Sequence, residues 1–408
     1  MEIGQGLSSW DFLNMKTQKH ILFFAETVTL AHLTRCIALA NNLYTTGKYN
    51  ITIAADNRYD EVIGSVPFQR IPLNSITSQY FAKKLAQGLP IYNAQTLTNY
   101  VHEDLKIIDK INPDFIIGDF RLSLAISSRI KKIPYATITN AYWSPYANIS
   151  YPIPEMPLTK IFGVTLAQKI FDRVRPFVFK LHTLAINKVC KKFRLPAIGD
   201  DLREAYTQAD HTLYADLESL IPMQPLPDNH VFIGPLLWSA KAPLPDWWES
   251  LPLDKPIIFI SLGSSGDYSL LPILLSTLSK MAVTVICITA QKTCIENNYE
   301  NVFISDFLPA DMVVKKADIV ITNGGSPMAY QCIAENKYII GLPSNLDQYL
   351  MMNIVDKANY GQLIRSGKVN SNAIKQAVNT AMSRIDKATS TNSCKIDIKK
   401  VIAIIDAA

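Results

Sequence analysis

The chain has 408 residues, of which 48% are hydrophobic and 18% charged, and its net charge is +5. This length exceeds one ordinary core and predicts two globular domains of roughly 200 residues each. No apolar run approaches the ~18 residues that cross a bilayer, and no basic segment followed by an apolar one opens the chain. We therefore expect a cytoplasmic protein without a signal peptide.

The six cysteines are scattered, with no C-x-x-C pair and no histidine at metal-ligand spacing. We expect no metal site and no disulfide framework. All six are interpreted as reduced, buried small residues. They are Cys36, Cys190, Cys287, Cys294, Cys332 and Cys394.

Residues 1–18 lack periodicity and are interpreted as a loose N-terminal extension. In residues 19–235, short apolar runs typical of strands alternate with stretches that carry apolar residues at helical spacing. This alternation predicts a parallel, doubly wound α/β sheet. Strands are expected at 20–25, 51–54, 115–117, 135–138, 211–214 and 231–233, with helices at 31–43, ending near 111, and through 130.

The positive charge is concentrated in residues 160–194, where nine Lys and Arg accompany Asp172 alone, so this segment carries +8 and the rest −3. Apolar residues at helical spacing and Pro176 predict two amphipathic basic helices that separate at this proline. Two interpretations stay open: helices that pack on one face, or a face for peripheral contact with a membrane or an acidic acceptor. Nucleic acid is not an expected partner, because no recognition motif accompanies the basic residues.

Residues 236–255 are rich in proline, have no period of their own and are interpreted as a linker. A second alternating β/α series follows in residues 256–389, so the fold class is two doubly wound domains. Its strands are expected at 256–261, 283–288, 302–304, 319–321 and 338–342. A last helical stretch, 396–408, lies in the segment 390–408.

The strand at 319–321 breaks at Gly324 and Gly325 before a helical segment through residue 334. A strand that turns through glycines into a helix N-terminus favours an anion, because unpaired N–H groups and the helix dipole face it. The next strand leads to Asp347 and Gln348. Because parallel strands end at the same edge of a sheet, we expect both turns to face one crevice.

Asn323-Gly324-Gly325, Gln331 and Asp347-Gln348, together with F-I-S-L-G-S-S at 259–265 and V-F-I-G-P at 231–235, resemble family 1 glycosyltransferases. The resemblance covers most of the chain. It implies a GT-B fold of two Rossmann-like domains facing across a cleft, with the C-terminal helix packing back on the first domain. The implied activity is inverting, metal-independent transfer of a sugar from a nucleotide diphosphate sugar, a UDP-sugar being the expected donor, to a hydroxyl group.

The resemblance also assigns a donor-binding set. On the residues alone, the serines suit an ordinary turn, Phe307 a core position, and the Asp-Gln pair a helix cap. Where the family has histidine and glutamate, this chain has Asn323 and Gln331, which is compatible with another nucleotide or with lost turnover. The donor set is Gly263, Ser264, Ser265, Phe307, Asn323, Gly324, Gly325, Ser326, Gln331, Asp347 and Gln348.

His32 follows the first strand, and the matching family position carries the catalytic base. An imidazole with its ordinary pKa near ~6.5 accepts a proton at neutral pH when its other nitrogen is held. Asp119 ends the strand at 115–117 and matches the aspartate that pairs with this histidine; alone, it also suits a helix N-cap. We therefore expect His32 and Asp119 to form the catalytic pair.

The acceptor is expected to be an apolar small molecule or lipid with a hydroxyl group, as in natural-product glycosylation. Its pocket is predicted to be walled by residues 76–92 and by aromatic residues after the strand at 135–138. Two alternatives are an inactive nucleotide-sugar-binding partner protein and a GT-B nucleotide-sugar epimerase. The aromatic residues are Tyr142, Trp143, Tyr146 and Tyr151.

Overall fold

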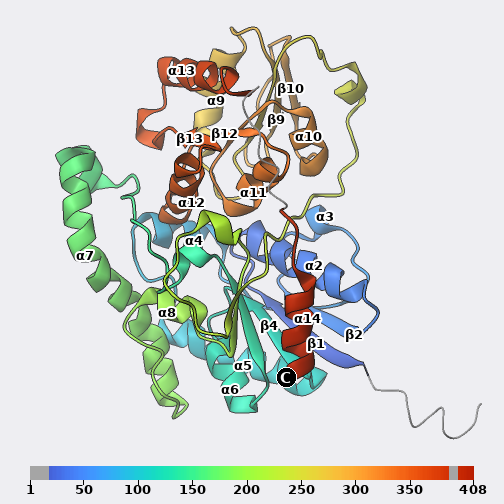
Figure 1. Ribbon diagram of the computed structural model, residues 1–408, viewed down its shortest axis with the longest axis vertical. Helices are drawn as coiled ribbons and strands as arrows, with labels where there is room; N and C mark the ends of the chain where they lie inside the picture. The colour runs from blue at the N-terminus through green and yellow to red at the C-terminus, as the bar shows by residue number, and fades with distance from the viewer. Residues whose placement is uncertain (1–17, 386–393) are drawn as a thin grey trace, which may run out of the picture.

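The computed structural model describes residues 18–385 and 394–408. Most of the predicted extension, 1–17, and the predicted boundary near residue 390 lie outside these ranges. The N-terminal half contains a seven-stranded parallel sheet of order β3-β2-β1-β4-β5-β6-β7 (Figure 1). Its strands are β1 (Lys19–Ala25), β2 (Tyr49–Ala55), β3 (Gln69–Pro72), β4 (Phe115–Asp119), β5 (Tyr135–Thr139), β6 (His211–Tyr214) and β7 (His230–Phe232).

Alternate residues of β1 explain why helices cover both faces of this sheet. Ile21 and Phe23 pack in a cluster with α2, whereas Leu22 and Phe24 pack in a cluster with α5 and α6. A central parallel strand is buried on both sides, so its sequence is continuously apolar. The helices are α2 (Leu30–Tyr44), α3 (Asp60–Ile63), α4 (Ser78–Ala86), α5 (Ala94–Ile111), α6 (Leu124–Lys131), α7 (Pro157–Lys192) and α8 (Leu202–Thr207).

The C-terminal half contains a six-stranded parallel sheet of order β10-β9-β8-β11-β12-β13. In β8, Ile258 and Ile260 pack toward α9 and α13, while Phe259 packs toward α10, α11 and α12. Two doubly wound parallel sheets confirm the fold class that the alternating pattern predicted. The strands are β8 (Ile257–Ser261), β9 (Thr284–Ile288), β10 (Val302–Ser305), β11 (Ile319–Thr322), β12 (Tyr338–Gly341) and β13 (Gly361–Leu363); the helices are α9 (Leu271–Leu278), α10 (Ala310–Lys316), α11 (Ser326–Ala334), α12 (Leu346–Lys357), α13 (Ser371–Met382) and α14 (Ile398–Ala407).

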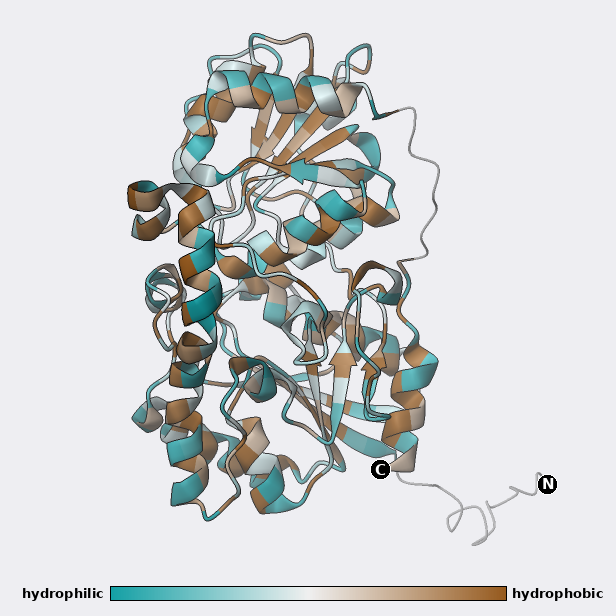
Figure 2. Cartoon of the chain, turned by 60° about the vertical axis from the view of Figure 1, so that its left-hand side comes forward, coloured by the Kyte–Doolittle hydropathy of each residue, from teal (hydrophilic) through white to brown (hydrophobic). Residues whose placement is uncertain are grey.

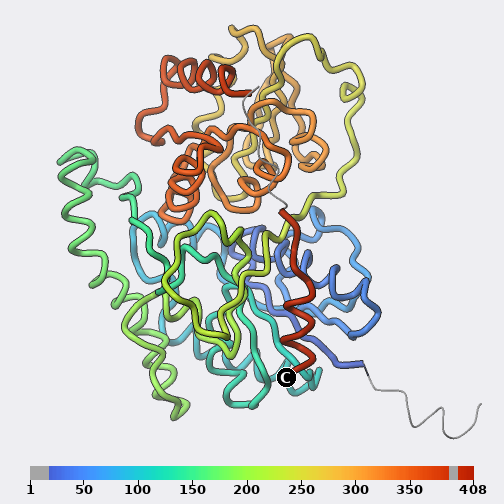
Figure 3. The backbone as a smooth tube through the Cα atoms, viewed as in Figure 1, coloured from blue at the N-terminus to red at the C-terminus, as the bar shows by residue number. Residues whose placement is uncertain are grey.

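The last helix, α14, lies on the N-terminal half although it follows the C-terminal half in the chain (Figure 3). Val401 and Ile405 are buried in the same cluster as β1 and α2. The Tyr49 hydroxyl donates to Asp406 at 2.7 Å. The chain therefore crosses between the halves twice, once through residues 236–255 and once before α14.

Two of the sequence expectations were wrong at this level. The basic segment, α7, continues through Pro176, and its helical geometry is interrupted at Gly163 instead (φ 68°, ψ 166°), where a kink separates a short first part from the long remainder. Pro176 and Asp172 are both exposed, so water can reach the carbonyl group that loses its helical donor. Cys294 is exposed, unlike the other five cysteines, because it lies in the loop between β9 and β10.

No helix within residues 18–385 and 394–408 is both long enough and apolar enough to span a membrane.

Candidate functional site

A cavity of about 490 Å³ lies between the two halves. Both sheets direct the carboxyl ends of their strands toward it, which is where open α/β sheets bind ligands. Most of the predicted site residues line this cavity, including His32 and Asp119 from the N-terminal half. From the C-terminal half, the lining includes Gly263, Ser264, Ser265, Phe307, Asn323, Gly325, Ser326, Gln331, Asp347 and Gln348.

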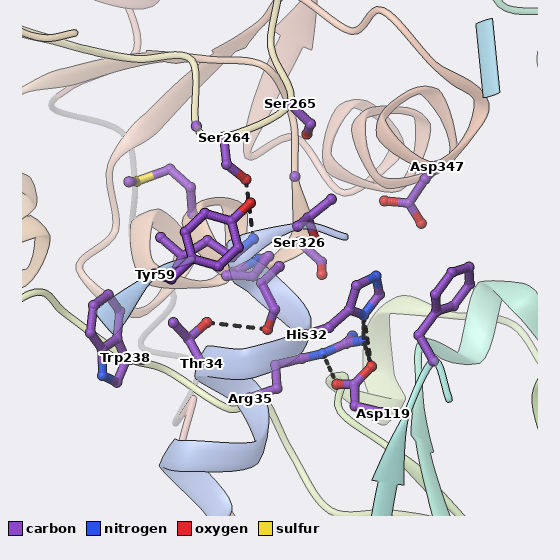
Figure 4. Close-up of a pocket in the computed structure, with 18 of the residues that line it drawn as sticks. His32, Thr34, Arg35, Tyr59, Asp119, Trp238, Ser264, Ser265, Ser326 and Asp347 are labelled. Carbon is purple, nitrogen blue, oxygen red and sulfur yellow. Dashed lines mark hydrogen bonds and ion pairs between the residues drawn. The ribbon is translucent and has the colours of Figure 1, made fainter. Parts of the chain in front are cut away.

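His32 lies in the first turn of α2, and Asp119 is the last residue of β4. The His32 Nδ1 atom is 2.7 Å from Asp119 Oδ1. Since an ionised carboxylate only accepts, Nδ1 donates to Asp119, and the other ring nitrogen points into the cavity (Figure 4). The pair that the sequence predicted is thus assembled with the geometry of a general base and its orienting group.

Phe120 holds the imidazole from one side. Its ring stacks on His32 with centroids 4.7 Å apart and planes 9° from parallel. Phe120 has φ 59°, a left-handed conformation that costs about 1–3 kcal/mol for a non-glycine residue. This backbone turn aims Asp119, Phe120 and Arg121 in three different directions.

Arg35 is a site residue that the sequence reasoning missed. Its Nε and Nη2 atoms each donate to a different oxygen of Asp119 at 2.8 Å. Burial alone would raise the pKa of Asp119, but the Arg35 guanidinium and His32 outweigh it and lower that pKa. Arg35 lies three residues after His32 on one helix face, which was the available signal.

A buried polar chain continues from Arg35 into the C-terminal half. Arg35 donates to Asn140 at 2.7 Å, and Asn140 donates to Asp216 at 2.9 Å. Tyr330 of α11 donates to the same Asp216 oxygen at 2.8 Å. The catalytic pair is therefore connected through hydrogen bonds to the helix that begins at the glycine turn.

The two glycines of this turn differ in backbone conformation and in the space around them. Gly324 has φ 82°, and a Cβ there would meet Met352 at 2.4 Å, so only glycine fits. Gly325 has an ordinary φ of −67°, and a Cβ there would meet nothing closer than Asn323 at 3.5 Å. Gly325 thus leaves open space in front of the N-terminus of α11, where a phosphate can approach the backbone.

Asn323 closes this turn instead of pointing freely into the cavity. Its Oδ1 accepts from the Gly325 N–H at 3.2 Å, and its Nδ2 donates to Ser265 at 3.4 Å. The Gln331 carboxamide, in contrast, lines the cavity without a hydrogen-bond partner among the described residues. Gln331 is therefore the better placed of the two amides to contact a ligand.

Asp347 and Gln348 form hydrogen bonds with different halves of the molecule. Gln348 is buried and donates to Ser265 Oγ at 3.1 Å, which joins the ends of β8 and β12. Asp347 accepts from the Trp143 indole of the N-terminal half at 2.7 Å. Asp347 thus faces the part of the cavity that the N-terminal half lines.

The acceptor side of the cavity is apolar, but only part of the predicted wall contributes to it. Tyr142 and Tyr151 are buried in the core, and neither they nor Tyr146 line the cavity. Short, tightly packed turns after β5 point Trp143 inward and these tyrosines away. The apolar lining includes Phe81, Leu85, Ile91, Phe120, Trp143 and Tyr206.

A second charged cluster lies beside the His32–Asp119 pair, and all its members except Glu103 are fully buried. Arg121 donates to Glu26 at 2.9 Å and to Asp104 and Glu103 at 3.0 Å. Burial outweighs Arg121 and raises the pKa of both Glu26 and Asp104. The guanidinium also stacks on Tyr100, 3.6 Å from the ring centroid.

Within the ranges that the structure describes, no group of three or more His, Cys, Asp and Glu side chains is arranged to hold a metal ion.

The sequence of this chain is 40% identical over 366 residues to the PGL/p-HBAD biosynthesis glycosyltransferase of Mycobacterium tuberculosis (strain ATCC 25177 / H37Ra). The alignment covers 90% of this chain and 85% of the relative. The chain belongs to the same glycosyltransferase family as this relative. This glycosyltransferase is also 40% identical over 367 residues to the PGL/p-HBAD biosynthesis rhamnosyltransferase of Mycobacterium bovis (strain BCG / Pasteur 1173P2), covering 90% of this chain and 81% of that one.

One relative from the same M. bovis strain is named an inactive PGL/p-HBAD biosynthesis glycosyltransferase. It is 42% identical over 263 residues, which cover 64% of this chain and 72% of that one. No family model matches the chain.

Among solved structures, the glycosyltransferase resembles the spinosyn rhamnosyltransferase SpnG, with a TM-score of 0.66 at 12% identity, covering 94% of this chain and 99% of that one. The calicheamicin glycosyltransferase CalG4 has a TM-score of 0.64 at 14% identity, covering 96% and 99%. At these identities the likeness shows the fold, and it confirms the GT-B class. The expected enzyme class is confirmed by the sequence relatives, whereas the role of each site residue stays a prediction.

Proposed function

We propose that this glycosyltransferase moves a sugar from a nucleoside diphosphate to a hydroxyl group of an apolar acceptor, with inversion and without a metal ion. The observation that carries the proposal is the His32–Asp119 pair at 2.7 Å, opposite an open glycine turn across one cavity. The base and the leaving-group site thus belong to different halves of the molecule. Such a separation suits direct displacement, because the nucleophile and the leaving group lie on opposite sides of the reacting carbon.

In the proposed step, His32 Nε2 takes the proton of the acceptor hydroxyl while its oxygen attacks the anomeric carbon. The bond from that carbon to the diphosphate oxygen breaks, and the diphosphate leaves with the electron pair. Asp119 stabilises the imidazolium that forms, and Arg35 holds the Asp119 carboxylate in place with two hydrogen bonds. The proton then passes to solvent or to the product diphosphate.

The donor is proposed to lie against the glycine turn, with the diphosphate at the N-terminus of α11. N–H groups and the helix dipole would stabilise the leaving group where a metal ion otherwise does. Ser264 and Ser265 would add hydroxyl donors, and Phe307 would stack against the base. We take a UDP-sugar as the first donor to test, with Gln331 accepting from the ribose hydroxyls.

The acceptor is proposed to be apolar because aromatic and aliphatic side chains form the wall next to His32. The relatives that carry the names glycosyltransferase and rhamnosyltransferase in PGL/p-HBAD biosynthesis support a lipid-like acceptor of this kind. A phenol or lipid hydroxyl group reaching His32 through this wall would be shielded from water.

A second candidate is a nucleotide-sugar-binding protein without turnover. It is favoured by the amides Asn323 and Gln331 and by the relative named inactive. Against it, the catalytic pair is intact and held by Arg35, and a binding protein has no physical need of that arrangement.

The test uses the purified full chain with UDP-, dTDP-, GDP- and ADP-sugars. A donor at 100 times its dissociation constant should stabilise the protein by about 2.7 kcal/mol in a thermal shift. The best donor should then support transfer to a hydrophobic phenol in the presence of EDTA, with an inverted anomeric configuration by NMR. Retention of configuration, or activity abolished by EDTA and restored by a divalent cation, would contradict the proposed mechanism.

Gly325→Val is the matched variant, because a Cβ at this position, with its ordinary φ, meets nothing in the protein closer than Asn323 at 3.5 Å. It should lose donor binding while its unfolding without donor stays like that of wild type. Donor binding without transfer in wild type would support the second candidate instead.

A further inference from the structure

The helix α7 exposes an unusual number of large apolar side chains. It stands at the edge of the molecule, on the side that Figure 2 turns toward the viewer. More than half of the exposed large apolar residues in the described ranges belong to it, and Phe177 is 63% exposed. They are Ile161, Phe162, Leu166, Val174, Phe177, Leu181 and Leu184.

The exposed side chains after Gly163 form one stripe along the outer face of the helix. Positions 177, 181, 184, 188 and 191 recur every three or four residues, and positions 166, 173 and 174 fall on the same face. This is the spacing of one helix face. The opposite face is buried through Phe179, Ile186 and Cys190. The helix is therefore apolar on two opposite faces, and only one of them packs on the protein.

Positive charges line the exposed stripe. Lys169, Arg173, Lys188 and Lys191 are exposed and form no ion pair within residues 18–385 and 394–408. Lys180 pairs with Asp200. An apolar stripe bordered by free lysine and arginine side chains has the chemistry of a helix that lies in a membrane interface.

We propose that the outer face of α7 docks on an anionic lipid surface. Its apolar side chains would enter the boundary between headgroups and acyl chains, and its basic side chains would contact lipid phosphates. A second copy of this chain is a poorer occupant, because two such faces would bring like charges together. An acidic protein would neutralise the charges but would need a matching apolar groove for a ridge that is about 40 Å long.

The inner face of α7 connects this surface to the cavity. Phe179 contacts the Trp143 ring with centroids 6.2 Å apart, and Trp143 lines the cavity. Docking would thus hold the acceptor side of the cavity next to the lipid from which an apolar acceptor comes. This last step rests on the proposed function, whereas the docking surface itself does not.

The test measures co-sedimentation of the full chain with phosphatidylcholine vesicles, with and without about 30% phosphatidylglycerol. We expect binding to the anionic vesicles that weakens as salt is added. Phe177→Ser with Leu184→Ser should reduce binding at least about tenfold at every salt concentration, because two apolar insertions are lost. Arg173→Gln with Lys188→Gln and Lys191→Gln should remove the preference for anionic lipid.

The matched controls remove an exposed leucine and an exposed lysine elsewhere: Leu253→Ser and Lys375→Gln should bind like wild type. Absence of wild-type binding at low salt, or unchanged binding of the serine variant, would overturn the proposal. So would binding to polyglutamate in place of vesicles, or a wild-type dimer that the serine variant converts to a monomer.

Transfer to a water-soluble acceptor without vesicles separates the two proposals. Both α7 variants should retain it, since neither touches the cavity. Retained transfer without vesicle binding contradicts docking alone, and vesicle binding without any transfer contradicts the proposed function alone.

Discussion

Two buried arginine clusters flank the carboxyl end of β4, and they differ in how their charges balance. Arg35 meets one carboxylate, Asp119, whose pKa is lowered. Arg121 meets three carboxylates, and burial raises the pKa of Glu26 and Asp104 despite the guanidinium. The two clusters are separated along β4 only by Phe120, whose left-handed backbone turns their side chains apart.

The comparison shows that a buried carboxylate stays ionised where one guanidinium faces one carboxylate, and only an ionised carboxylate can orient a catalytic histidine. In the Arg35 cluster the single carboxylate stays ionised and leaves one histidine nitrogen facing the cavity. In the Arg121 cluster carboxylates outnumber the guanidinium, and burial raises the pKa of the two that are fully buried, Glu26 and Asp104. The first cluster is therefore suited to catalysis, whereas the second positions β1, α5 and the turn after β4.

The largest expected effect comes from removing the base of the first cluster. His32→Ala should lower kcat by about 10²- to 10⁴-fold, the usual contribution of general-base catalysis. Calorimetry should find donor binding nearly unchanged, because the proposed donor contacts lie in the other half. His102→Ala, which removes an exposed histidine far from the cavity lining, is the control. Wild-type turnover in the His32 variant would end its assignment as the base.

The next effect contrasts the two arginines. Arg121→Met should lower the free energy of unfolding by about 3–5 kcal/mol, because it leaves buried carboxylates without a cation. Arg35→Met should cost less, since Asp119 keeps His32 as a partner. In that variant kcat should also fall, because Asp119 loses the two hydrogen bonds that hold its carboxylate toward His32. Urea unfolding and kcat measure the two effects, and equal losses of stability in the two variants would contradict the predicted difference between the clusters.

The smallest effect concerns the excess carboxylates. Because the pKa of Glu26 is raised above its ordinary 4.5, the native protein binds that proton more tightly than the unfolded chain. This stabilisation is complete below pH 4.5 and is lost as pH rises through the raised value. The stability advantage of wild type over Glu26→Gln should therefore shrink as pH rises, by at most about 1.4 kcal/mol per unit.

Urea midpoints from pH 5 to pH 8 measure this trend. Glu218→Gln, which removes an exposed carboxylate outside the cluster, serves as the control. A gap between wild type and the Glu26 variant that widened with pH would mean that Arg121, not burial, dominates this site.

The sequence alone predicted the two parallel sheets because the doubly buried part of a strand is continuously apolar, as at residues 21–25 of β1 and 319–321 of β11. It did not predict β3. This edge strand buries only Ile71, so its sequence is not continuously apolar. It also expected a break at Pro176 in α7, because a proline predicts a kink from local geometry. Exposure of the freed carbonyl and burial of the opposite face decided otherwise.

At the candidate site, too, the sequence predicted some features and missed others. The sequence identified His32, Asp119 and the glycine turn because each follows a strand end or matches a family spacing. It did not find that Arg35 holds both oxygens of Asp119, 84 residues away, or that Trp143 donates to Asp347 across the cavity. Local pattern determines which segments become strands and helices, since burial has a period along the chain. Arg35 meets Asp119 because β1 pairs with β4, and Trp143 meets Asp347 because the two halves face each other across the cavity. These partners are far apart along the chain, so only the tertiary structure decides them.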